Sequence, residues 1–139
     1  MQGTKILVVE ENDDCRRILV LRLQHMGVGT VREATSGDEA LECILQDPPD
    51  LVFLTLTLPV PDGRETAHRI RALPGARGQL PIIAVTAYVM SWDRAKALTA
   101  GCDEYVTKPI VDPGEIRHKL EWLLTHGRRE SPARAVRQA

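Results

Sequence analysis

One stretch of the sequence decides the fold: Pro49-Asp50-Leu51-Val52-Phe53-Leu54-Thr55-Leu56-Thr57-Leu58-Pro59-Val60-Pro61-Asp62-Gly63. Its first half is a nearly continuous apolar run, which is typical of a parallel strand that is covered on both faces. Its second half holds two prolines and a glycine, which stiffen the chain and turn it. We therefore predict a buried strand that ends near Thr55 and continues into a rigid turn.

Other segments of the chain repeat this alternation of short apolar runs and amphipathic stretches. Strands are predicted at 6–9, 29–34, 51–54, 82–85 and 105–106, with 29–34 as a more polar edge strand. Helices are predicted at 13–26, 36–46, 63–73, 91–100 and 112–125. Crossovers of this length require parallel pairing with right-handed connections. The sequence thus predicts an α/β fold, a (βα)5 flavodoxin-like doubly wound parallel sheet with strand order 2-1-3-4-5.

Two of these helices show clear sequence signals. In 13–26, an apolar stripe places Cys15, Ile18, Leu19, Leu23 and Met26 on the side expected to face the sheet. The helix of 36–46 begins Ser36-Gly37-Asp38-Glu39, which is the spacing of a capping box.

Composition bounds the class of protein. The chain has 139 residues and a net charge of −1, which suits one domain over residues 1–126 and does not favour nucleic acid or membrane as a partner. Residues 127–139 hold four arginines against one glutamate and no apolar period, so we expect a disordered Arg-rich tail. Three cysteines without metal spacing, no long apolar run and no signal-peptide layout indicate a cytoplasmic protein.

Polar residues follow each predicted strand, at the edge where doubly wound sheets bind ligands. They are Glu10, Glu11, Asp13 and Asp14 after the first strand, Thr55 and Thr57 after the third, Thr86 and Ala87 after the fourth, and Thr107 and Lys108 after the fifth. The first loop has four carboxylates and no glycine, so it cannot cradle a phosphate directly, which argues against a flavodoxin-like nucleotide binder. Clustered oxygens suit Mg²⁺, although a solvated acidic loop would look the same.

Four separate segments together resemble the receiver domain of two-component response regulators, over residues 4–125. They are 5–12, 49–63, 82–87 and 100–110. The resemblance implies that Glu10 and Glu11 hold Mg²⁺ with the backbone carbonyl of Thr57. It also implies a phosphoryl-site and switch set of Thr55, Thr86, Ala87, Tyr105 and Lys108.

Two residues depart from that family pattern. Thr55 stands where the resemblance implies the phosphoacceptor aspartate, and Glu11 is one methylene longer than the usual aspartate. Both changes are expected to weaken or abolish the Mg²⁺ site, because Mg²⁺ demands near-ideal octahedral geometry. A threonine hydroxyl without an adjacent base is a poor nucleophile, so we expect no catalytic residue and no enzyme activity.

The resemblance therefore implies a stand-alone, degenerate receiver that signals by phosphorylation-independent protein–protein interaction. Its expected partners are a histidine kinase, a phosphotransfer protein, another signalling protein or a second copy of the chain. Trp92, Tyr105 and the helix at 112–125 are the candidate interaction residues. Two alternatives stay open: Thr55 or a neighbouring acid accepts a phosphoryl group, or Thr55 is a substitution made to disable the site.

Overall fold

The computed structural model describes residues 3–59, 61–86, 91–107 and 113–127, in which strands and helices alternate. The elements are β1 (Lys5–Val9), α1 (Asp13–His25), β2 (Thr30–Ala34), α2 (Gly37–Gln46), β3 (Leu51–Thr55), α3 (Gly63–Arg71), the 3-10 helix η1 (Gly75–Gln79), β4 (Ile82–Thr86), α4 (Ser91–Ala100), β5 (Glu104–Thr107) and α5 (Pro113–His126). This order confirms the predicted (βα)5 pattern, and η1 is an addition that the sequence reading missed. Of the predicted tail, only Gly127 lies within the described residues.

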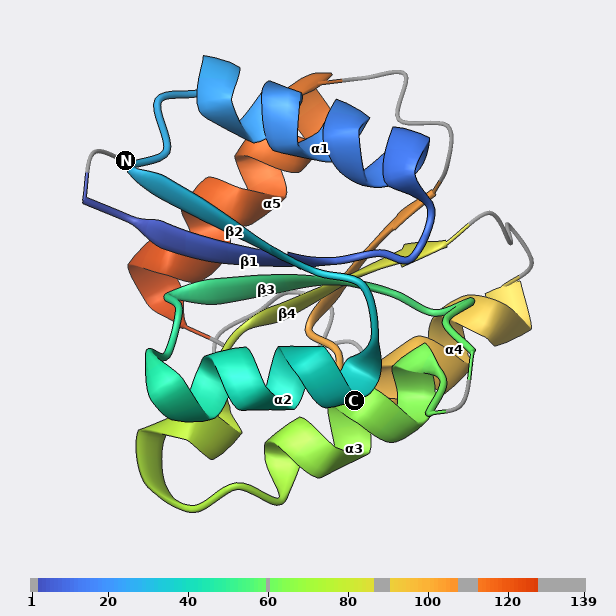
Figure 1. The fold of residues 1–139 in the computed structure, drawn as a ribbon. Coiled ribbons are helices and arrows are strands. Elements are labelled where there is room, and N and C mark those ends of the chain that lie inside the picture. Colours follow the sequence, from blue (N-terminus) through green and yellow to red (C-terminus); the bar gives the residue numbers. More distant parts are fainter. Residues whose placement is uncertain (1–2, 60, 87–90, 108–112, 128–139) are drawn as a thin grey trace.

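The five strands form one parallel sheet in the order β2-β1-β3-β4-β5, as the sequence predicts. Strand β3 is buried at every position, whereas β2 is partly exposed along most of its length and lies at the edge. Figure 1 shows α1 and α5 on one side of the sheet and α2, α3 and α4 on the other.

Alternating strand residues belong to two apolar clusters, one on each side of the sheet. Leu7, Val9, Val52 and Leu54 pack with residues of α2, α3 and α4. Their neighbours Ile6, Val8, Leu51 and Phe53 pack with residues of α1 and α5. Both faces of the sheet are therefore covered, which explains why the strands read as continuous apolar runs. Among the described helices, none is both long enough and apolar enough to cross a membrane.

The predicted apolar stripe of α1 is partly wrong. The helix buries Leu19, Val20 and Leu23, whereas Ile18 is 51% exposed. Leu21, one turn further on, is 46% exposed. Because each residue turns the helix by about 100°, the sheet is covered by the strip that runs through 19, 20 and 23. Ile18 lies to one side of that strip, and α1 presents two large apolar side chains to solvent.

Side-chain caps fix where the helices begin. Asn12, Ser36 and Asp62 each accept a hydrogen bond from a backbone N–H three residues ahead, at the starts of α1, α2 and α3. The capping box predicted at Ser36 forms one of its two hydrogen bonds. The Ser36 hydroxyl accepts from the amide of Glu39, whereas the Glu39 carboxylate accepts from the Thr35 hydroxyl at 3.3 Å. Helix α4 ends at Ala100 and is followed by Gly101, whose φ of +114° favours glycine.

Candidate functional site

The candidate site lies at the carboxyl ends of β1, β3 and β4. The register pairs Val9 with Leu54, so the residues that follow them, Glu10 and Thr55, come side by side. Thr55 is paired in turn with Val85, which precedes Thr86 at the end of β4. The side chains of Glu10, Thr55 and Thr86 are all buried. The structure therefore gathers three of the predicted site residues at one end of the sheet.

Thr55 is almost completely buried, with only 1% of its surface exposed. Its hydroxyl lies 3.4 Å from the hydroxyl of Thr57, and either oxygen can donate the hydrogen bond. Thr57 itself is exposed. The residue at position 55 is thus a buried alcohol that contacts a second alcohol closer to solvent.

A close approach of the backbone holds the turn after β3 in place. The amide of Leu56 donates to the carbonyl of Val85, and Gly63 donates to the carbonyl of Leu56. A Cβ added at Gly63 would lie 2.3 Å from the carbonyl oxygen of Thr55, so only glycine fits there without moving the chain. The start of α3 therefore packs directly against the end of β3 and fixes the backbone of the site.

The acidic loop after β1 is folded back on itself. The Glu10 carboxylate accepts a hydrogen bond from the amide of Asn12 at 3.1 Å, and the side chain of Glu10 is 5% exposed. The Asn12 side chain caps α1 by accepting from the amide of Cys15 at 2.9 Å. By contrast, Glu11 and Asp14 are exposed. The predicted acidic pair is therefore split between one buried and one exposed carboxylate.

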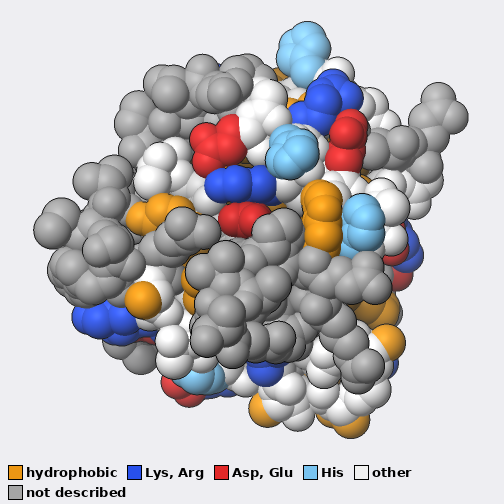
Figure 2. Space-filling view, turned by 180° about the vertical axis from the view of Figure 1, so that it is seen from behind, with side chains coloured by type: hydrophobic (Ala, Val, Ile, Leu, Met, Phe, Trp, Pro, Cys, Tyr) orange, Lys and Arg blue, Asp and Glu red, His pale blue; other side chains and the backbone are white. Residues whose placement is uncertain are grey.

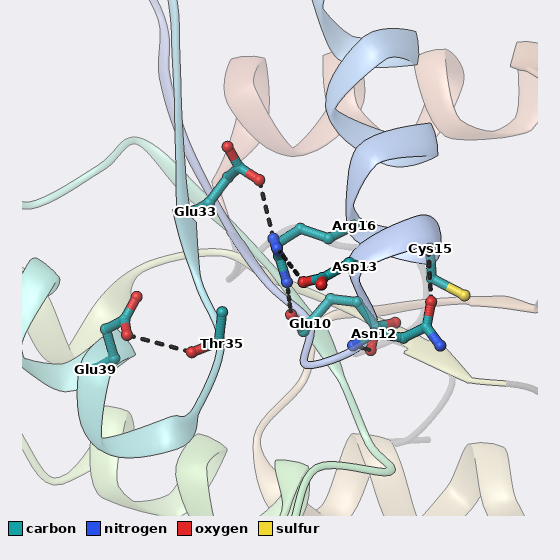
Figure 3. A network of polar contacts seen from close by, with 8 residues as sticks. All are labelled: Glu10, Asn12, Asp13, Cys15, Arg16, Glu33, Thr35 and Glu39. Carbon is teal, nitrogen blue, oxygen red and sulfur yellow. Dashed lines mark hydrogen bonds and ion pairs between the residues drawn. The ribbon is translucent and has the colours of Figure 1, made fainter.

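Arg16, in the first turns of α1, places a positive charge beside the acidic loop, as Figure 3 shows. Its guanidinium contacts the carboxylates of Asp13 at 2.6 Å and Glu33 at 2.9 Å, and it also donates to the backbone carbonyl of Glu10 at 2.9 Å. The hydrogen bond with Asp13, and next that with Glu33, raises the pKa of Arg16. The sequence reading missed this residue, although the spacing of three between Asp13 and Arg16 on a helix was a usable signal.

The remaining predicted site residues fall into two groups. Tyr105 is half-buried in β5, and its carbonyl accepts a hydrogen bond from Lys119 of α5 at 2.6 Å. It packs against the apolar cluster on the side of α2, α3 and α4. Ala87 and Lys108 lie outside the described residues, as do the side-chain surroundings of Trp92.

The Mg²⁺ donors expected from the family resemblance are only partly present among the described residues. Within residues 3–59, 61–86, 91–107 and 113–127, no three His, Cys, Asp or Glu side chains are grouped to hold a metal ion. Glu10 and Glu11 are the carboxylates that the family resemblance assigns to the metal, and Glu11 is exposed. The third polar group is the alcohol of Thr55, which carries no charge. The site therefore has one carboxylate fewer than the family resemblance implies.

Curated proteins similar to this chain include regulators and sensor kinases. An uncharacterised 14.6 kDa protein of Leptolyngbya boryana is 40% identical over 112 residues, which is 80% of this chain and 82% of that protein. The transcriptional regulatory protein AfsQ1 of Streptomyces coelicolor is 36% identical over 126 residues, 91% of this chain and 53% of AfsQ1. The sensor protein GacS of Pseudomonas syringae is 32% identical over 135 residues, 96% of this chain but 15% of GacS. The chain thus spans only a part of several of its relatives.

Solved structures agree with these relatives. The receiver domain of the sensor histidine kinase PA1611 from Pseudomonas aeruginosa, with a magnesium ion coordinated in its active site cleft, has a TM-score of 0.79 and 30% identity, covering 88% of this chain and 98% of that one. A two-component response regulator from Clostridium difficile has a TM-score of 0.78 and 27% identity, covering 88% of this chain and 97% of that one. The family model of the response regulator receiver domain matches residues 6–121. This chain therefore belongs to the response regulator receiver domain family.

Proposed function

We propose that this receiver is degenerate and signals through protein–protein contacts, without accepting a phosphoryl group at position 55. The observation that carries the proposal is the buried alcohol of Thr55, 1% exposed, where the family resemblance implies a carboxylate. An alcohol needs a neighbouring base to become a nucleophile. The four histidines of the chain, His25, His68, His118 and His126, are all exposed on α1, α3 and α5. The neighbouring Glu10 carboxylate already accepts a hydrogen bond from the amide of Asn12.

The burial of Thr55 also argues against modification by an unrelated kinase. Such a kinase must bring the hydroxyl to its own active site, and a side chain that is 1% exposed at the end of a central strand is not available for this. A phosphothreonine at position 55 would therefore require local unfolding of β3.

Mg²⁺ binding should be weakened by the same changes. When bound in a receiver, the ion would neutralise the acidic residues that surround it. In this chain Arg16 already neutralises Asp13 and Glu33, and it lies against the carbonyl of Glu10. The acidic loop thus has a cation of its own, and we propose that the fold does not depend on a metal.

Protein partners fit the surface better than nucleic acid does. Figure 2 shows the face behind the view of Figure 1, on which described acidic and basic side chains lie next to each other and form no large basic patch. On α1, the exposed side chains of Ile18 and Leu21 are three residues apart and share one side of the helix. We propose these two residues, with Tyr105 and α5, as contacts for a histidine kinase, a phosphotransfer protein, another signalling protein or a second copy of the chain.

The test is the intact mass of the protein after incubation with acetyl phosphate, with and without Mg²⁺. The unmodified chain should gain no phosphoryl group in either condition. The double variant Thr55→Asp with Glu11→Asp should gain one phosphoryl group in a Mg²⁺-dependent reaction, and the variant Glu11→Asp alone serves as the matched control. A Mg²⁺-dependent adduct on the unmodified chain would contradict the proposal. Lability of that adduct to hydroxylamine would then indicate an acyl phosphate on a neighbouring acid, and stability would indicate phosphothreonine.

A further inference from the structure

A small basic cavity lies between the end of α1 and the beginning of α5, which we call the α1–α5 cavity. It measures about 300 Å³ and is lined by Arg22, His25 and Met26 of α1 and by Gly114 and Arg117 of α5. Two guanidinium groups and an imidazole thus line one cavity, and no acidic side chain is among the lining residues. Its volume is at the lower end of the range of small-molecule sites, about 300–1,000 Å³.

The cavity is separate from the site at the strand ends. Helix α1 begins at Asp13, beside the acidic loop, and Arg22 follows nine residues later. At 1.5 Å per residue, these two positions are about 14 Å apart along the helix axis. A ligand in the α1–α5 cavity would therefore not occupy the place of a metal ion or phosphoryl group near Glu10 and Thr55.

Arg22 contributes the first of the two guanidinium groups that line the cavity. Its Nε atom is buried and has no hydrogen-bond partner among the described residues. Buried polar groups in proteins are nearly always hydrogen-bonded, and a guanidinium carries a charge besides. A basic residue in the last turn also complements the negative end of a helix, which accounts for the presence of Arg22 and His25 on α1. It does not account for Arg117, which comes from another helix to the same cavity.

Arg117 is only weakly paired with an acidic side chain among the described residues. Its one ion pair within the described residues is with Glu121 at 3.4 Å, and both side chains are about half exposed, so the pair is weak. An anion bound in the cavity would be attracted by both Arg22 and Arg117, because both residues line it. The first turn of α5 adds the positive end of that helix, and Gly114 brings no side chain into the space.

We propose that the α1–α5 cavity binds the phosphate group of a small phosphorylated molecule. A dianionic tetrahedral group accepts hydrogen bonds from several directions, which matches donors that come from two helices. A planar carboxylate carries one charge and is satisfied by a single guanidinium, so it uses fewer of these donors.

The test is a titration of the full chain followed by amide NMR shifts, with glycerol 3-phosphate, inorganic phosphate and acetate at constant ionic strength. Glycerol 3-phosphate should shift the amides of Met26 and Gly114 saturably, and acetate should bind at least about tenfold more weakly because it lacks the second charge. Arg22→Gln should weaken binding by roughly tenfold or more, as expected for the loss of one charge-assisted hydrogen bond. Arg117→Gln is a second variant that tests the other helix.

Arg17→Gln is the matched control, because Arg17 is exposed on the same helix and loses the same charge. It should leave the dissociation constant within about twofold, and the thermal midpoints of all three variants show whether they remain folded. Equal weakening by Arg17→Gln and Arg22→Gln would mean attraction by overall charge and would overturn the proposal. It would equally be overturned if no ligand shifts these amides saturably, or if inorganic phosphate binds and the phosphate ester is excluded.

Discussion

Thr55 places a small neutral side chain next to a buried carboxylate. Glu10 and Thr55 follow the paired residues Val9 and Leu54, and they are 5% and 1% exposed. A second carboxylate at position 55 would be desolvated and would repel Glu10, and both effects cost free energy unless a cation compensates them. At the scale of one residue, the alcohol therefore avoids a charge repulsion with Glu10 that a metal ion would otherwise have to offset.

Thr55→Asp should accordingly lower the free energy of unfolding by at least about 2 kcal/mol in metal-free buffer at pH 7, because it buries an uncompensated charge. Added Mg²⁺ should return part of this loss by neutralising the introduced carboxylate. Urea denaturation with and without Mg²⁺ measures both effects. Thr55→Val is the control of similar shape, and it should cost about 1 kcal/mol or less because the contact to Thr57 is long. Equal stability of the two variants without metal would contradict the argument.

The ion pair of Asp47 with Lys5 offers a test of surface charge at the opposite end of the sheet from the site. The Lys5 ammonium, 2.8 Å away, lowers the pKa of the Asp47 carboxyl, chiefly through their hydrogen bond. A lowered folded-state pKa stabilises the protein above the unfolded-state pKa, and this stabilisation is lost as the pH falls below about 4. Lys5→Met should raise the pKa of Asp47 in an NMR titration, whereas Lys5→Arg should leave it lowered. An unchanged pKa in Lys5→Met would show that the ion pair does not persist in solution.

At the scale of elements, one arginine joins four parts of the fold. The Arg71 guanidinium, at the end of α3, contacts Asp103 at 2.9 Å and the backbone carbonyls of Gly78, Leu80 and Gly101. Asp103 is fully buried and also accepts from the amide of Ile82, the first residue of β4, at 2.9 Å. The pair thus connects α3, the segment of η1 and Leu80, β4 and the turn before β5.

Arg71→Met should lower the free energy of unfolding by about 3–5 kcal/mol, because it leaves the Asp103 carboxylate buried without its counter-charge. The matched control is Arg69→Met on the same helix. Arg69 forms ion pairs with Asp38 and Glu65 that are largely exposed, so its removal should cost less than about 1 kcal/mol. Urea denaturation compares the two variants. Similar losses would mean that Arg71 contributes only as a surface residue does.

The strands and α-helices could be predicted from the sequence, whereas the ion pairs that join them could not. Strands such as Leu51–Thr55 and helix starts such as Ser36 depend on local residue patterns. Arg71 and Asp103 are 32 positions apart, and no periodicity relates them. The outward position of Ile18 was missed for a similar reason, because the angle at which α1 meets the sheet depends on packing.

For the site, the convergence of Glu10, Thr55 and Thr86 followed from the strand order. The depth of each residue did not follow from it. Glu10 and Glu11 are neighbours of the same type, yet one is buried and the other exposed. Which carboxylate turns inward depends on the cap at Asn12 and on Arg16, and both act through the folded loop.

At the scale of the whole molecule, the sheet makes the two apolar clusters one cooperative unit. Each central strand sends alternate residues to the two clusters, as Leu7 and Val8 do in β1. Removing the helices from one face would expose half of the side chains of every strand to water, so neither layer can persist without the other. A destabilising substitution on the α2 face should therefore lower the stability of the α5 face by the same amount.

Ile44→Ala tests this coupling, because Ile44 is fully buried on α2, while Trp122 packs on the opposite cluster. The variant should lose about 2–5 kcal/mol, as expected for a large-to-small change in a core. In a Trp92→Phe background, the fluorescence of Trp122 and the far-UV circular dichroism should shift to the same new urea midpoint. Leu45→Ala is the control, since Leu45 is 53% exposed and its loss should matter by less than about 1 kcal/mol. If the Trp122 midpoint stayed in place while the dichroism unfolded in two steps, the two layers would be independent, and the shared sheet would not be what couples them.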